Sequence, residues 1–296
     1  MNIIISINEK YIEPAKTMLY SLACHQKEHL VIYLLQSSIR KEMLEDFREF
    51  LADRCHASLV LVPIDRALFA GAPKKKWLSE ETYYRLISFA LLPEEVERAL
   101  WLDGDIIIKG NISELYLADF ENQYAVVCAE DSTKHHKRLG LSLEHRYFNA
   151  GVVLYNMKLI QRDFAVQDVF DCIEKHKDHL DLMDQDVLNV MFENHVKYMD
   201  AQVYNNETWG FHVLGKSKMK ELKEKAKIIH YKGSMKPWNP KGANWADGYW
   251  WRYEKARGGR RMAALRYSIP HGFVKMRLVF REMYYVIQSQ ARKIRK

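Results

Sequence analysis

The chain has 296 residues, of which 48% are hydrophobic, and a formal net charge of +7. This length and composition suit a globular protein with a large core and exclude a disordered chain. No run of 18 apolar residues is present and residues 1–5 lack the pattern of a signal peptide, so we expect neither a membrane span nor export. Four scattered cysteines without a CxxC pair fit reduced thiols in a cytoplasmic protein.

The positive charge is concentrated near the C-terminus. Residues 251–296 hold 13 Lys and Arg against 2 acidic residues, a net charge of +11, so residues 1–250 carry −4. A basic body would favour nucleic acid, whereas this distribution favours an anionic surface met by the tail alone. We therefore expect a globular body over residues 1–250, a basic segment over 251–296 and no nucleic-acid partner.

The first part of the chain alternates buried strands with helices. We expect strands over Asn2–Ile7, Val31–Leu35 and Ser58–Val62, and helices over Pro14–Leu22 and Arg40–Leu51. This alternation predicts a parallel sheet covered by helices on both faces, with ligands at the carboxyl ends of the strands. Asn8 and Tyr11 follow the first strand and are candidates to hold a nucleobase. The alternative is an Asx-type turn and an ordinary half-buried tyrosine.

A helix is expected over residues 79–92, because Ser79 can cap it, two acids occupy its first turn and Pro93 ends it. Arg85 lies among apolar residues of this segment. A buried arginine needs a partner, and either a structural ion pair or a contact with a sugar would provide one.

Asp103-Gly104-Asp105 separates two apolar runs. Residues i and i+2 of an extended chain point the same way, so the two carboxylates can bind one cation, and Gly104 leaves room for a ligand at the backbone. Hard oxygen ligands favour Mg²⁺ or Mn²⁺, which suit a diphosphate. The alternative is an ordinary turn, since Asp-Gly is a common hairpin signal.

Polar residues also accompany buried elements in the middle of the chain. Small residues at 150 and 151 precede an expected strand and mark a close approach to the backbone, with the amide of Asn149 beside it. Asp184 and Gln185 open an expected helix, where an acid can serve the helix dipole but an amide does not. The pair His135-His136 is expected in a solvated loop rather than a metal site.

The segment 227–238 predicts a strand that runs into a loop. His230 offers the nitrogen ligand that would complete an Asp₂His set for Mn²⁺, and Lys236 can neutralise phosphate oxygens.

In their order and approximate spacing, these motifs resemble glycosyltransferase family 8, and within it the bacterial lipopolysaccharide galactosyltransferases and glucosyltransferases. The resemblance covers about residues 1–250. It implies an α/β fold in which residues 1–250 form a single Rossmann-like nucleotide-sugar glycosyltransferase domain. This domain would be of the GT-A type, with a mixed central sheet. The basic tail over 251–296 follows this domain.

The resemblance also implies roles for individual residues. They are Asp103, Asp105 and His230 as Mn²⁺ ligands, Gly104, Gly233 and Lys236 at the diphosphate, Asn8 and Tyr11 at the nucleoside, and Arg85, Asn149, Ala150, Asp184 and Gln185 around the donor sugar, with Asp131 beside them. Gln185, Asp184 and Asp131 are the catalytic candidates. Position 8 is usually aspartate in the family, so Asn8 is a departure.

The implied reaction is retaining transfer of a hexose from UDP-galactose or UDP-glucose to a hydroxyl of a cell-surface glycan or lipid-linked acceptor, with Mn²⁺ or alternatively Mg²⁺. Gln185 is an amide and a poor nucleophile, which favours front-face attack by the acceptor with the departing phosphate as base. Two alternatives stay open: a metal-dependent sugar-nucleotide phosphohydrolase or nucleotidyltransferase, and a non-catalytic sugar-nucleotide-binding membrane adaptor.

From Phe273 onward, apolar and basic residues fall on separate faces of a predicted helix. Such an amphipathic helix predicts peripheral attachment to the anionic inner face of the cell membrane. The alternative is a terminal helix packed on the catalytic domain.

Overall fold

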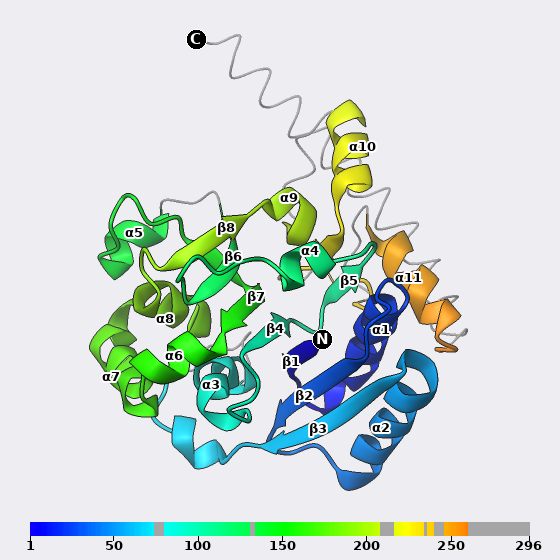
Figure 1. Ribbon diagram of the computed structural model, residues 1–296, viewed down its shortest axis with the longest axis horizontal. Coiled ribbons are helices and arrows are strands. Elements are labelled where there is room, and N and C mark those ends of the chain that lie inside the picture. The colour runs from blue at the N-terminus through cyan, green and yellow to red at the C-terminus, as the bar shows by residue number, and fades with distance from the viewer. Residues whose placement is uncertain (74–79, 131–133, 208–215, 234–235, 240–245, 260–296) are drawn as a thin grey trace.

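The computed structural model describes residues 1–73, 80–130, 134–207, 216–233, 236–239 and 246–259. A seven-stranded sheet in the order β3-β2-β1-β4-β7-β6-β8 forms its centre (Figure 1). The strands are β1 (Asn2–Ser6), β2 (Leu30–Gln36), β3 (Ala57–Pro63), β4 (Arg98–Leu102), β6 (Ala125–Ala129), β7 (Phe148–Asn156) and β8 (Val196–Met199). Strands β1 to β4 are parallel, whereas β7 is antiparallel to β4 and β6. Strands β6 and β8 also pair in parallel, so β7 alone among these seven strands runs against the others and the mixed α/β sheet is confirmed.

Helices cover both faces of this sheet, because alternate residues of each strand point to opposite sides. Ile3 and Ile5 of β1 pack on the face that carries α1 and α2, while Ile4 packs on the other face. The covering helices are α1 (Ile12–Ala23) and α2 (Lys41–Cys55) on the first face, and α3 (Ser88–Leu91), α6 (Met157–Asp163), α7 (Val166–His176) and α8 (Asp184–Met191) on the second. Each fully buried aliphatic side chain stabilises the folded state by about 1.5–3 kcal/mol relative to an exposed one.

A second, three-stranded sheet lies beside the first and has the order β5-β10-β9. Its strands are β5 (Ile106–Ile108), β9 (Asn206–Glu207) and β10 (Ile228–His230). Residues 103–105 carry the chain from β4 in the large sheet to β5 in the small one. Gly104 and Asp105 form the turn considered from the sequence, but this turn does not close a hairpin. Pairing of β10 with β5 sets His230 opposite Ile106 and therefore close to Asp105.

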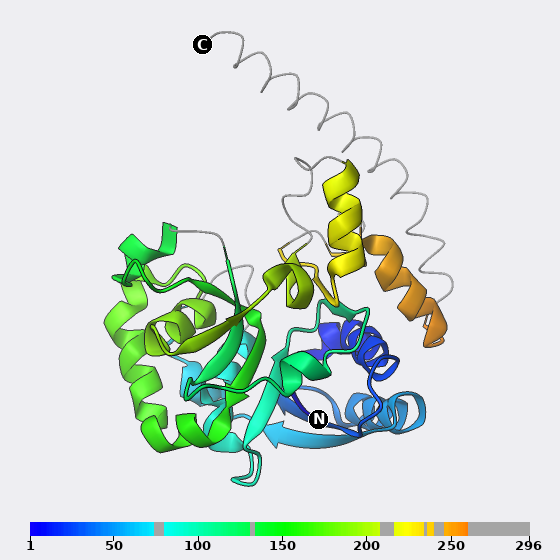
Figure 2. The same cartoon turned by 45° about the horizontal axis from the view of Figure 1, so that its top comes forward.

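Helix α11 (Asp247–Ala256) packs against α1 (Figure 2). The buried guanidinium of Arg257, one residue beyond α11, forms ion pairs with Glu13 at 2.8 Å and Glu254 at 2.7 Å. The domain boundary predicted at residues 250/251 falls inside α11. The helix predicted from Phe273 lies outside the described residues. Within those residues, none of the helices combines the length and apolar character needed to cross a bilayer.

The remaining elements are short. They are α4 (Ser113–Tyr116), α5 (Lys134–Leu139), α9 (Ala201–Tyr204), α10 (Lys216–Lys225) and the 3₁₀ helices η1 (Glu9–Tyr11), η2 (Arg66–Phe69), η3 (Glu80–Ile87) and η4 (Lys177–His179). The helix predicted over 79–92 is η3 followed by α3, and it ends before Pro93 as expected; Ser79 lies outside the described residues. The solvated loop predicted for His135-His136 is wrong, because both belong to α5. His135 stacks on Tyr147 at 4.1 Å between ring centroids, and His136 is buried.

Candidate active site

Asp103, Asp105 and His230 meet at the carboxyl end of β4. The Nε2 of His230, at the end of β10, lies 3.2 Å from Oδ1 of Asp105 and 3.8 Å from Oδ2 of Asp103. One ligand atom of each residue lies within 4.8 Å of the others. Residues 103–105 form a turn rather than an extended segment, yet the two carboxylates converge as predicted. Two carboxylate oxygens and an imidazole nitrogen at this spacing fit a divalent ion such as Mn²⁺ or Mg²⁺.

Gly151 makes this convergence possible. A Cβ built on Gly151 would lie 2.3 Å from Cε1 of His230 and 2.9 Å from Oδ2 of Asp103, closer than real Cβ contacts. The predicted close approach to the backbone is therefore confirmed, and the approaching group is the His230 ring. Residues 149–151 lie within β7 rather than ahead of it, where the pairing of β7 with β6 shifts register.

Lys236 brings its ammonium group to the cluster. Its Nζ forms an ion pair with Oδ2 of Asp105 and donates a hydrogen bond to the carbonyl oxygen of Tyr231 at 2.6 Å. Burial alone would raise the pKa of Asp105, but Lys236 and His230 together bring that pKa below its usual value. Asp105 is therefore ionised at neutral pH, as a metal ligand must be.

Arg85 joins the cluster to the start of α8. Its Nη2 donates to Oδ1 of Asp103 at 2.9 Å, and its Nε lies 2.8 Å from Oδ2 of Asp184. Its guanidinium also covers the ring of Trp101 at 4.5 Å. The structural ion pair considered from the sequence is present. Burial raises the pKa of Asp184 to about 6, although the charge of Arg85 opposes this shift.

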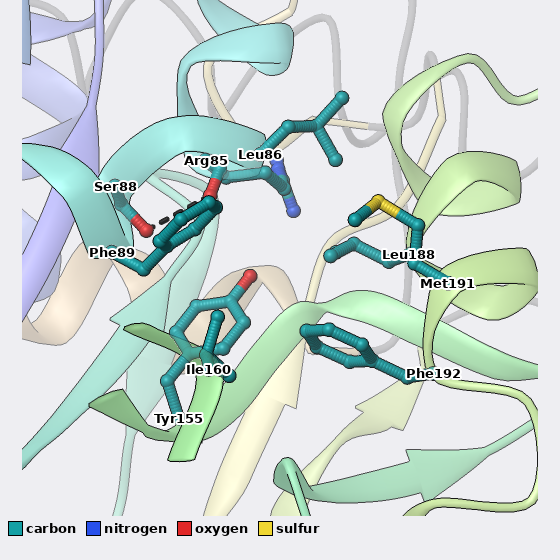
Figure 3. Close-up of a pocket in the computed structure, with 9 residues that line it drawn as sticks. All are labelled: Arg85, Leu86, Ser88, Phe89, Tyr155, Ile160, Leu188, Met191 and Phe192. Atoms are coloured by element: carbon teal, nitrogen blue, oxygen red, sulfur yellow. Dashed lines mark hydrogen bonds between the residues drawn. The ribbon is translucent and has the colours of Figure 1, made fainter. Parts of the chain in front are cut away.

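One side of Arg85 borders a largely apolar pocket (Figure 3). The pocket is lined by Arg85, Leu86, Ser88, Phe89, Tyr155, Ile160, Leu188, Met191 and Phe192. The hydroxyl of Tyr155 is buried and has no hydrogen-bond partner among the described residues. Apolar walls keep water from the guanidinium, which strengthens its ion pairs with Asp103 and Asp184.

The amide of Gln185 is oriented by two donors. Its Oε1 accepts hydrogen bonds from Nδ2 of Asn149 at 2.8 Å and from the backbone N–H of Ala150 at 3.1 Å. Because the backbone N–H can only donate, the Oε1 end of the amide must face Ala150. The buried Nε2 makes no hydrogen bond of acceptable geometry with the described residues. The hydroxyl of Tyr147 lies near the side chain of Gln185.

The residues predicted to hold the nucleoside, Asn8 and Tyr11, follow β1, and Tyr11 lies against Gly104. Asn8 forms the Asx-type turn considered from the sequence, since its Oδ1 accepts the N–H of Lys10 at 3.1 Å. Tyr11 packs against Gly104, where a Cβ would lie 3.2 Å from Cδ1 of its ring. The room predicted at Gly104 is thus filled by Tyr11. The ring of Tyr11 also meets that of Trp238 edge-on at 5.8 Å.

Two further predicted residues remain, and only one of them, Gly233, belongs to the described residues. Gly233 adopts a φ of 67° in the loop after β10, a conformation that favours glycine. Asp131 lies outside the described residues.

Several site residues were missed from the sequence. Asn205, between α9 and β9, places its Oδ1 2.9 Å from Nδ1 of His230. Glu130 accepts a hydrogen bond from Asn149 at 3.0 Å and forms an ion pair with Lys232, which also pairs with Glu207 at 2.6 Å. Lys232 lies in the segment 227–238 considered above, but no pattern in the sequence marked Asn205.

A mixed sheet whose central strand ends in an Asp-Asp-His cluster defines an α/β protein with the GT-A glycosyltransferase fold. The same fold occurs in the crystal structure of the galactosyltransferase LgtC with donor and acceptor sugar analogues, at a TM-score of 0.76 and 20% identity, covering 86% of this chain and 96% of that chain. Residues 2–242 match the model of glycosyl transferase family 8, and the chain belongs to this family.

Sequence relatives include two lipopolysaccharide glycosyltransferases. The chain is 27% identical over 261 residues to the lipopolysaccharide 1,2-glucosyltransferase of Escherichia coli, covering 85% of this chain and 76% of the relative. It is 29% identical over 203 residues to the lipopolysaccharide 1,3-galactosyltransferase of Salmonella typhimurium, covering 66% of this chain and 60% of the relative.

Proposed function

We propose that this protein is a retaining hexosyltransferase that moves galactose or glucose from a UDP-sugar to a hydroxyl of a cell-surface glycan or lipid-linked acceptor. Mn²⁺, or alternatively Mg²⁺, is the proposed cofactor. The observation that carries the proposal is the convergence of Asp103, Asp105 and His230. The two relatives named above act on lipopolysaccharide according to their names, which supports a glycan acceptor.

Positive charge is what the departing diphosphate requires. A divalent ion held by Asp103, Asp105 and His230 would stabilise negative charge on the leaving group. Lys236 supplies further charge beside Asp105, and Gly233 is proposed to offer its backbone N–H. Tyr11 is proposed to stack on the uracil, next to the Asx turn of Asn8.

On the sugar side, Gln185 is proposed to donate from Nε2 to the donor near its anomeric carbon. Arg85 and Asp184 form a rigid ion pair there, and Asn149 and Ala150 hold Gln185 in place. The acceptor oxygen attacks the anomeric carbon on the face that the phosphate leaves. The new C–O bond forms as the old one breaks, and the hydroxyl proton passes to the departing phosphate.

A carboxylate nucleophile is not required by this arrangement. Oε1 of Glu130 accepts a hydrogen bond from Asn149 and pairs with the ammonium group of Lys232, so these two residues already hold this carboxylate. Asp184 is likewise occupied by Arg85. These partners favour the front-face route over a covalent glycosyl-enzyme.

The decisive experiment incubates the protein and Mn²⁺ with a panel of UDP-sugars and glycan acceptors. We expect one UDP-hexose to be consumed with formation of a glycoside of retained configuration, which NMR identifies. Asp103→Asn and Asp105→Asn should lose nearly all transfer while the fold persists. Full activity in excess chelator would contradict the metal role, and free sugar or pyrophosphate without glycoside would favour hydrolysis or nucleotidyl transfer.

We also propose that the basic segment attaches the enzyme to the cytoplasmic face of an anionic membrane. Each basic residue near such a surface adds about 1 kcal/mol, so several give reversible, salt-sensitive binding. The test is sedimentation with anionic and neutral vesicles, comparing the full chain with a chain ending at Gly259. That end point retains Arg257, which anchors α11 to α1. Equal recovery of both chains would contradict the proposal.

A further inference from the structure

We propose that Asn205 is a positioning residue that holds His230 in the tautomer able to bind a metal ion. The inference rests on the metal site of the proposed function but concerns a residue outside the predicted ligand set. A neutral imidazole carries one N–H, and the nitrogen that carries it cannot be a ligand. The hydrogen bond made by the other ring nitrogen decides between the two forms.

The argument begins at a backbone group whose role is fixed. The N–H of Gly151 donates to Oδ1 of Asn149 at 3.0 Å. Nδ2 of Asn149 consequently faces the other way and donates to the carboxylate of Glu130 at 3.0 Å. A backbone N–H only donates and an ionised carboxylate only accepts, so the amide of Asn149 has one orientation.

The orientation of Asn149 then fixes that of Asn205. Nδ2 of Asn205 lies 2.9 Å from Oδ1 of Asn149, which must act as the acceptor. The other end of the Asn205 amide, Oδ1, lies 2.9 Å from Nδ1 of His230. Since Oδ1 is only an acceptor, Nδ1 of His230 carries the proton. The lone pair of Nε2 is then directed at Asp103 and Asp105.

The fold holds the side chain of Asn205 in place beside His230. It directly precedes β9, whose pairing with β10 sets Glu207 beside His230. Only 2% of Asn205 is exposed, so water cannot replace its contacts. Without its Oδ1, the Nδ1 proton of His230 would be buried without that partner. The opposite tautomer, with its proton on Nε2 against the carboxylates, would become favourable instead.

Three variants separate this role from simple packing. Asn205→Ala removes both hydrogen bonds, whereas Asn205→Asp keeps an acceptor for Nδ1 but introduces a buried charge. Asn206→Ala is the matched control, because Asn206 is 3% exposed and its Nδ2 donates to Gln202 instead of contacting His230. The probe is Mn²⁺ alone, with bound and free ion measured by electron paramagnetic resonance. Nitrogen NMR of histidine-labelled, metal-free protein reports the His230 tautomer, assigned with His230→Gln.

We expect Asn205→Ala to weaken Mn²⁺ binding about 10- to 100-fold and to lose the single Nδ1–H form of His230. Asn205→Asp should retain most of the affinity, and Asn206→Ala should match the wild type. A purely structural role instead predicts that Asn205→Asp is at least as damaging as Asn205→Ala. That ranking, or unchanged binding in Asn205→Ala, would overturn the inference.

The two proposals fail in different ways. Wild-type protein that binds no Mn²⁺ would refute the metal site of the proposed function. The NMR arm still decides the role of Asn205 in that case, because the tautomer of His230 is read without metal. A neutral wild-type His230 that carries its single proton on Nε2 would refute the inference by itself.

Discussion

Substituting Gly151 by alanine should abolish the metal site through a single added methyl group. The Cβ of alanine would lie 2.3 Å from Cε1 of His230, whereas ordinary contacts begin at 3.4 Å. The imidazole must therefore retreat by about 1.1 Å, the difference between these two distances. Metal–ligand distances tolerate deviations of about 0.2 Å, so Nε2 would leave coordinating range.

The same contact limits the damage to the fold. Overpacking a buried position by one methyl group costs about 1–3 kcal/mol, which a domain of this size tolerates. Mn²⁺ affinity and turnover should fall about 100-fold or more while the protein remains folded. Urea denaturation followed by circular dichroism measures the first effect, and calorimetric titration with Mn²⁺ measures the second.

A matched glycine and a double variant complete the design. Gly110→Ala is the control, because its Cβ would meet only Lys227 at an ordinary 3.5 Å. If Gly151→Ala acts through His230, adding it to His230→Ala should cause little further loss of affinity. Undiminished Mn²⁺ binding in Gly151→Ala would refute this reasoning, as would additive losses in the double variant.

Three other predictions follow from individual contacts. Gln185→Ala should lower kcat about 100-fold with a smaller change in the donor KM, which steady-state kinetics will resolve; a change in KM alone would argue against a transition-state contact. Burial raises the pKa of Asp184 to about 6, above its unfolded value. This group therefore favours folding below about pH 4, and its contribution to the free energy of unfolding is lost as the pH rises to 6. Asp184→Asn should weaken this pH dependence in urea titrations, and an unchanged pH dependence would contradict the assignment. Arg257→Met should lower the free energy of unfolding in urea by about 2–3 kcal/mol, because Glu13 and Glu254 lose a buried partner. An unchanged free energy of unfolding would show that other contacts hold α11.

The elements of the fold were predictable because buried runs and helix caps are local signals. The strand expected over Val31–Leu35 is β2 with one more residue at each end, and the helix expected over Arg40–Leu51 is α2 with its end four residues later. The Asp-Asp-His grouping also followed from sequence, since each residue ends or follows a buried strand. Their roles in the reaction stay predictions.

The features that could not be predicted from the sequence depend on contacts between segments that are distant in the chain. In the sequence, Asn205 is an ordinary polar residue with no distinguishing pattern around it. Only the pairing of β9 with β10 brings it into contact with His230. The His135-His136 pair is polar, which suggested a solvated loop, yet both residues lie in α5 and His135 stacks on Tyr147. The space expected at Gly104 is filled by Tyr11, which is 93 residues away in sequence and has no local signal.

The charges around the site explain why the proposed function includes a cation. The ion pairs described above connect five carboxylates with three permanent cations: Asp103, Asp105, Glu130, Asp184 and Glu207 against Arg85, Lys232 and Lys236. These groups sum to −2 when ionised, which would repel a diphosphate in a site with little water. One divalent ion at the Asp-Asp-His cluster brings that sum to zero. The proposed cofactor therefore has two separable tasks, to admit the donor and to stabilise its leaving group, so removing it should weaken UDP binding as well as turnover.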